Sequence, residues 1–129
     1  MKTKQLGYHT LPNGLKLHFS INCWYALEEQ AGLTASQFLK EFGEELSKED
    51  RNEFILLDQL ADITYAAATA YSQEEETELD TNRYKIKNEL IGLDGQGIMD
   101  LAAVIFGTAD AEDKLANTGK QKTQAKKIK

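Results

Sequence analysis

The two histidines are the side chains best suited to hold a transition metal or to move a proton near neutral pH. His9 and His18 flank Asn13-Gly14, the residue pair preferred in a two-residue hairpin turn. We therefore expect a hairpin in which His9 lies opposite His18, on the face away from Leu17. A zinc site needs three or four ligands, so this pattern favours a pair of histidines that face solvent, and it predicts no metal.

Carboxylate pairs could supply a general acid and a general base if burial separated their pKa values. Asp58 and Asp62 are four residues apart on one face of an expected helix, and residues 74–76 are consecutive glutamates. The helical projection places no apolar residues around them, so we expect a solvated surface. Cys23 stands next to Trp24 on an apolar stripe, which favours a buried structural thiol over a nucleophile.

The glycine-rich stretch that follows Asp94 resembles the middle of a calcium-binding loop. An EF-hand also needs an acid two residues before Asp94 and a glutamate at its twelfth position, but Gly92 and Ala103 stand there. We therefore predict a turn at residues 95–97, with Asp94 near the start of a helix. Because the sequence also lacks a phosphate-binding loop, G-x-S-x-G and H-E-x-x-H, we expect no enzyme and no cofactor. The alternative is a small enzyme that uses the aspartate pair or the histidine pair.

The charge of the chain is unevenly distributed. All 21 acidic residues and nine of the 15 basic residues lie within 1–113, whereas 114–129 holds six lysines and no acid. An acidic body repels phosphate backbones, which argues against a nucleic-acid-binding protein. No segment has the ~20 consecutive apolar residues that span a bilayer, and no apolar region follows the basic start, so we expect neither a membrane segment nor a signal peptide. The single cysteine fits a reducing compartment.

The spacing of apolar residues predicts a mainly α fold, a small domain of about five helices over residues 1–113. A β-hairpin precedes the helices at about residues 6–20, and a disordered lysine-rich tail follows them at 114–129. Alternation places Leu15, Leu17 and Phe19 on the buried face of the hairpin. Besides a helix that begins after Thr34, we expect helices over 22–31, 48–72, 82–91 and 98–106. The other expected N-caps are Asn22, Ser47, and Asp80 or Thr81.

The helix expected over 48–72 has apolar residues over more than half of its circumference. Such a helix is typical of the centre of a domain, with neighbours on two sides. Its alanines at 66–68 and 70 would let one neighbour approach closely. The segment 98–106 is apolar nearly all round, which predicts burial either within the domain or against a partner.

The order of these features resembles the small tail assembly chaperones of long-tailed bacteriophages. The hairpin sequence Leu11-Pro12-Asn13-Gly14-Leu15-Lys16-Leu17 leads into Asn22-Cys23-Trp24-Tyr25-Ala26-Leu27-Glu28-Glu29-Gln30-Ala31-Gly32-Leu33-Thr34. Phe38-Leu39, a long helix at 54–71 and a last helix at 98–106 follow, so the resemblance covers residues 11–106.

This resemblance implies a non-enzymatic protein that binds the tape-measure protein and keeps it soluble while the tail tube assembles. It also implies that the protein acts in the cytoplasm of the bacterial host, is absent from the mature virion and forms an oligomer with copies of itself. A longer form made by a ribosomal frameshift is implied as well, and the end Ala125-Lys126-Lys127-Ile128-Lys129 would suit such a frameshift. The alternative is a small helical adaptor or inhibitor that binds one folded protein partner.

A chaperone of this kind needs an apolar surface that receives helices and an acidic rim that keeps the complex soluble. The wide apolar arc of the third helix and the last helix are the candidates for that surface. The residues that we expect to bind the partner are Leu60, Ile63, Tyr71, Met99 and Phe106. The alternative for each of them is an ordinary place in the core.

Overall fold

The structure, a computed structural model, describes residues 7–107. The elements are β1 (Tyr8–Thr10), β2 (Lys16–His18), α1 (Ile21–Ala31), α2 (Ala35–Ser47), α3 (Glu53–Glu75) and α4 (Arg83–Ile91), followed by a fifth helix over residues 95–107. The predicted mainly α fold with an N-terminal hairpin is confirmed. The predicted disordered tail at 114–129 lies outside the described residues.

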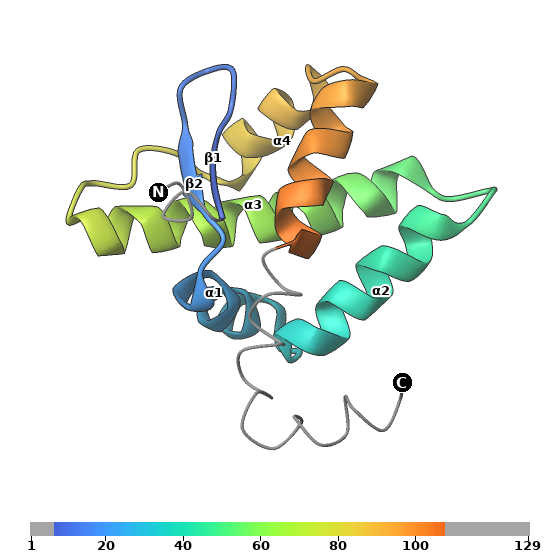
Figure 1. Ribbon diagram of the computed structural model, residues 1–129, viewed down its shortest axis with the longest axis horizontal. Helices are drawn as coiled ribbons and strands as arrows, with labels where there is room; N and C mark the ends of the chain where they lie inside the picture. Colours follow the sequence, from blue (N-terminus) through green and yellow to red (C-terminus); the bar gives the residue numbers. More distant parts are fainter. Residues whose placement is uncertain (1–6, 108–129) are drawn as a thin grey trace, which may run out of the picture.

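Helix α3 runs through the middle of the molecule, as its wide apolar arc predicts. Figure 1 shows α1 and α2 on one side of α3, and the hairpin, α4 and the fifth helix on the other. The alanines at 66–68 and 70 are at most 2% exposed. Helix α1 packs against this part of α3, and the Sγ of Cys23 on α1 lies 4.0 Å from the carbonyl oxygen of Ile63 on α3.

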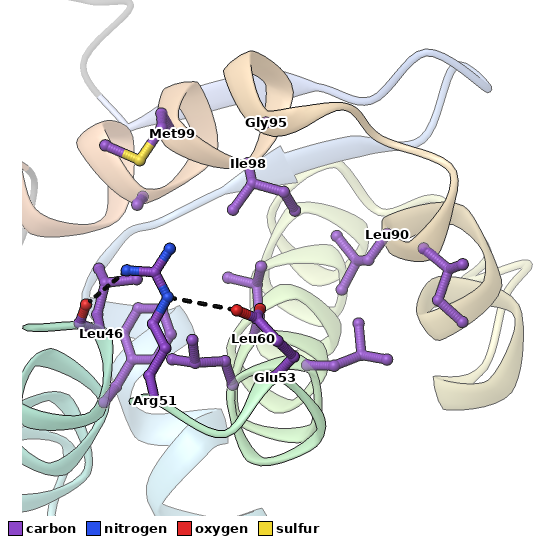
Figure 2. A pocket seen from close by; sticks show the side chains of 13 residues that line it. Leu46, Arg51, Glu53, Leu60, Leu90, Gly95, Ile98 and Met99 are labelled. Atoms are coloured by element: carbon purple, nitrogen blue, oxygen red, sulfur yellow. Dashed lines mark hydrogen bonds and ion pairs between the residues drawn. The ribbon is translucent and has the colours of Figure 1, made fainter. Parts of the chain in front are cut away.

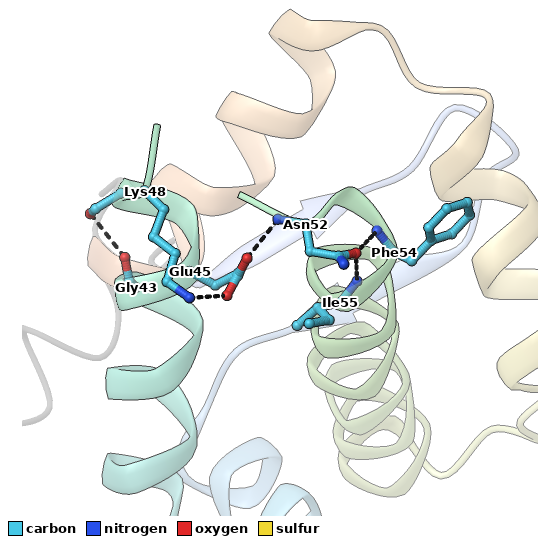
Figure 3. Close-up of polar contacts among 7 residues, drawn as sticks. Gly43, Glu45, Lys48, Asn52, Phe54 and Ile55 are labelled. Atoms are coloured by element: carbon cyan, nitrogen blue, oxygen red, sulfur yellow. Dashed lines mark hydrogen bonds and ion pairs between the residues drawn. The ribbon is translucent and has the colours of Figure 1, made fainter. Parts of the chain in front are cut away.

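The connection between α2 and α3 separates two helices that the sequence analysis placed end to end. Asn52, and not Ser47, caps α3, because its side-chain oxygen accepts hydrogen bonds from the N–H groups of Phe54 and Ile55 at 2.9 and 3.1 Å (Figure 3). The carboxylate of Glu45, only 8% exposed, accepts from the N–H of Asn52 at 2.6 Å. These bonds satisfy the free donors at the start of α3, so the helix begins five residues later than predicted.

The other predicted N-caps differ from the structure in two of three cases. The Thr34 side chain accepts from the N–H of Gln37 at 3.1 Å and caps α2, as predicted. Helix α4 is capped by Asn82 instead of Asp80 or Thr81. Helix α1 begins after Ser20, whose side chain makes no capping hydrogen bond, and the side chain of Asn22 donates to Glu74 instead of capping the helix.

The hairpin buries the predicted face but has a different register. Leu17 and Phe19 are 0% exposed and pack into the core. Tyr8 lies opposite His18, and His9 lies opposite Leu17. The two histidines are therefore not neighbours across the strands, and the predicted histidine pair is wrong.

The reason for the shifted register is the loop. The N–H of Leu11 donates to the carbonyl of Leu15 at 2.9 Å, which closes a loop of three residues, 12–14. A two-residue type I′ turn requires positive φ at both central positions. Only Gly14 of the loop has positive φ, at 94°, which matches a three-residue loop with glycine in the left-handed position. Each strand position therefore faces a partner one residue away from the predicted one.

The fifth helix is longer than predicted and is packed on one side only. Residues 95–97, the expected turn, form its first turn, and the Asp94 side chain accepts from the N–H of Gly97 at 2.8 Å. Leu101 and Ile105 are 0% exposed, whereas Met99 is 58% exposed. Of the two expected placements, burial within the domain therefore applies to one face of the helix, and the other face remains open.

Candidate partner-binding groove

An open apolar pocket of about 400 Å³ lies where α2, α3, α4 and the fifth helix meet (Figure 2). We call it the apolar groove. Its floor consists of leucines that project from different helices, among them Leu56, Leu60 and Leu90, which are 8%, 4% and 1% exposed. Arg51, Ile91 and Met99 line its mouth. The remaining lining residues are Phe42, Leu46, Glu53, Leu57, Gly95, Ile98 and Ala102.

Two large apolar side chains that line the groove are exposed to solvent. Ile91, at the end of α4, is 64% exposed, and Met99 on the fifth helix is 58% exposed. Ile86 and Leu90 form the buried stripe of α4, and Ile91 falls about 100° away from Leu90 around the helix. Ile91 is not among the residues predicted to bind a partner, although its position off this stripe was a usable signal.

Ion pairs between α3 and α4 position this end of the groove. Asp62 accepts from Arg83 at 2.5 Å, and Asp58 pairs with Lys87 at 2.6 Å. The expected solvated surface describes Asp58, whose side chain is 54% exposed, whereas the side chain of Asp62 is only 27% exposed. Both carboxylates also join α3 to α4. The hydrogen bond from Lys87 lowers the pKa of Asp58.

Two exposed apolar residues continue the spacing of these ion pairs. The two ion pairs show that α3 and α4 run antiparallel, with steps of four residues on each helix. Phe54 lies one such step before Asp58 on α3, and Ile91 lies one step after Lys87 on α4. Phe54 is 80% exposed. Ile91 and Met99, the exposed apolar residues that line the groove, form what we call the apolar rim.

The mouth of the groove carries one charged pair. The guanidinium of Arg51 donates to the carbonyl of Leu46 at 3.1 Å and to the carboxylate of Glu53 at 3.4 Å (Figure 2). Arg51 thereby links the end of α2 to the start of α3. An apolar interior with a few polar groups at the edge is typical of a binding site.

The five residues expected to bind a partner lie in different places. Leu60 and Met99 line the groove. Ile63 is 0% exposed and belongs to the core, so it lines no surface in this conformation. Phe106 stacks on Phe42 with ring centroids 5.6 Å apart and is partly buried. Tyr71 packs edge-on against Tyr8 of the hairpin, away from the groove.

A second polar cluster lies at the other end of α3. Helix α3 continues through Glu75, so Glu74, expected on a solvated surface, is helical and partly buried. Its carboxylate accepts from His18 Nδ1 at 2.5 Å, Ser20 Oγ at 2.6 Å and Asn22 Nδ2 at 2.8 Å. Burial raises the pKa of Glu74, but the three hydrogen bonds outweigh this effect, and the pKa lies below its ordinary value. We call this the Glu74 cluster; it ties the hairpin and α1 to α3.

The remaining residue that could act chemically, Cys23, has a structural position in the core. Cys23 is 0% exposed, as predicted, and burial together with the charge of Glu74 raises the pKa of its thiol. A nucleophilic cysteine needs the opposite shift. Within residues 7–107, no three His, Cys, Asp or Glu side chains come close enough to share a metal ion.

Comparison with known proteins found no matching family model, no matching curated protein and no matching solved structure. Within residues 7–107, no helix combines the length and the apolar character that crossing a bilayer requires.

Proposed function

We propose that this protein is a non-enzymatic tail assembly chaperone that binds the tape-measure protein of a long-tailed phage and keeps it soluble during tail tube assembly. The observation that carries the proposal is the apolar groove with its exposed rim of Ile91 and Met99. A surface of this kind is costly to leave in water and is typical of a protein-binding site. The sequence resemblance supplies the identity of the client.

The physical properties of a tape-measure protein fit this surface. A long helical protein exposes apolar stripes until it is assembled, and such stripes cause aggregation. A helix lying on the groove would bury its stripe against the leucines of α3 and α4. The many acidic side chains of the chaperone would keep the complex in solution. In this role the protein acts in the cytoplasm of the host and is absent from the mature virion.

The test uses the full chain and a helical fragment of a tape-measure protein. Light scattering follows precipitation of the fragment, with and without a several-fold molar excess of chaperone. We expect suppression by the native chain and its loss in Met99→Glu, because a charge on the rim opposes apolar contact. Tyr25→Glu is the matched control, since Tyr25 is 62% exposed on α1, outside the groove.

Two results would count against the proposal. Equal precipitation with and without the native chain would exclude a chaperone for this client. A stoichiometric complex with a folded globular protein, combined with no affinity for tape-measure helices, would support the adaptor or inhibitor instead.

A further inference from the structure

The described part of the chain is strongly acidic. Residues 7–107 carry 18 Asp and Glu side chains against seven Lys and Arg. Several of these acids adjoin the groove: Glu53 lines it, Asp94 precedes the lining residue Gly95, and Asp100 follows Met99. All three are exposed. Arg51 and Glu53 both line the groove and pair at 3.4 Å, so their charges offset each other. The acidic border of the groove therefore depends on the exposed Asp94 and Asp100, within a body that is acidic overall.

The charge decides between the partners that could cover the groove. A second copy of the chain would bring the same acidic border into contact with this one, and like charges across an interface repel. The segment 108–129 has six lysines, but Leu115 and Ile128 are its only large apolar residues and are 13 positions apart. It therefore offers no apolar stripe. A different protein that carries apolar and basic residues together would match both the apolar lining and the acidic border of the groove.

The shape of the surface favours a helix as the binding element. The walls of the groove are side chains of helices, and they present no free strand edge to pair with an extended peptide. A helix satisfies its own backbone hydrogen bonds and needs only side-chain contacts. A helix lying across the mouth would cover the rim residues Ile91 and Met99, which are 64% and 58% exposed.

We propose that the groove binds an amphipathic helix whose large apolar side chains recur at i, i+4 and i+7 and are flanked by Lys or Arg. The apolar side chains enter between Leu60, Leu90 and Ile98, and the basic side chains reach Glu53 and Asp100. This inference rests on the proposed function and specifies which part of the client is recognised. A client segment without basic flanks binds less tightly, because only the apolar contacts remain.

Three synthetic helical peptides test the proposal by isothermal titration calorimetry with the full chain. The first has a Leu and Phe stripe flanked by Lys, the second has the same stripe flanked by Glu, and the third has the Lys residues with a scrambled stripe. We expect the first to bind about tenfold more tightly than the second, as a few exposed ion pairs allow. High salt should reduce this difference, and the scrambled peptide should not bind.

Charge-reversal variants test whether the acidic residues at the groove cause the preference for the Lys-flanked peptide. Glu53→Lys combined with Asp100→Lys should remove or invert the preference for the Lys-flanked peptide. Glu29→Lys combined with Glu78→Lys is the matched control, because both glutamates are exposed and lie on α1 and after α3, outside the groove. Thermal unfolding of each variant establishes that it is folded.

The outcomes separate this inference from the proposed function. If the Lys-flanked and Glu-flanked peptides bind equally, or if the control pair alters the preference as much as the groove pair does, the charge selection is refuted. The chaperone function would still stand if the native chain prevented precipitation of the tape-measure fragment. A concentration-dependent dimer that Met99→Glu abolishes would overturn the proposal in favour of a second copy.

Discussion

Replacing Glu74 tests how the hairpin is held to the helical part of the fold. In the native chain its carboxylate accepts hydrogen bonds from three side chains, those of His18, Ser20 and Asn22. These donors come from β2, the residue before α1, and α1 itself. Glu74→Ala removes all three bonds and leaves the hairpin attached to α3 mainly through apolar contacts.

The magnitude follows from the number and burial of these bonds. A buried hydrogen bond to a charged group contributes about 1.5–3 kcal/mol, and exposure reduces this value. The side chains of Glu74 and His18 are 21% and 19% exposed, and the bond from Asn22 is open to solvent. We therefore expect Glu74→Ala to lower the free energy of unfolding by roughly 2 kcal/mol in total. For a domain of this size that loss corresponds to roughly 6–10 °C in Tm.

The effect of Glu74 should depend on pH in a defined direction. Because the pKa of Glu74 is lowered in the folded protein, its ionised form stabilises the fold above the ordinary glutamate pKa of about 4.3. This contribution is lost as the pH falls through the lowered pKa of the folded state. The difference in stability between the native chain and Glu74→Gln should therefore be present at neutral pH and shrink in strong acid.

Chemical denaturation monitored by circular dichroism at a series of pH values measures both quantities. Glu75→Ala is the control, since Glu75 is the exposed neighbour on the same helix. The reasoning would be refuted if Glu74→Ala and Glu75→Ala had equal stability. It would also be refuted if the difference between the native chain and Glu74→Gln stayed constant down to strong acid.

Two further predictions concern single contacts. Asn52→Ala removes the cap of α3 and should lower the free energy of unfolding by about 1 kcal/mol. The same chemical denaturation measures this loss, and an unchanged free energy of unfolding would show that the helix start is held without this cap. Because burial raises the pKa of the Cys23 thiol, a thiol reagent such as Ellman's reagent should react with it only in denaturant, and rapid reaction of the native chain would contradict its buried position.

Local residue patterns predict most of the elements. Periods of three and four residues located the five helices of residues 7–107, and strict alternation identified Leu17 and Phe19 as the buried face of the hairpin. The wide apolar arc identified α3 as the central helix. These features depend on residues close together in the chain, and local periodicity and capping report such features directly.

Only the tertiary structure decided the hairpin register, the role of Glu74 and the groove. The register depends on how the loop at 12–14 closes, and the bonds of Glu74 join residues more than 50 positions apart. Within one apolar arc, Ile63 is fully buried where α1 packs against α3, whereas Phe54, in the first turn of α3, is 80% exposed. Periodicity gives the direction of a side chain, but the packing of the other helices determines whether that side is covered.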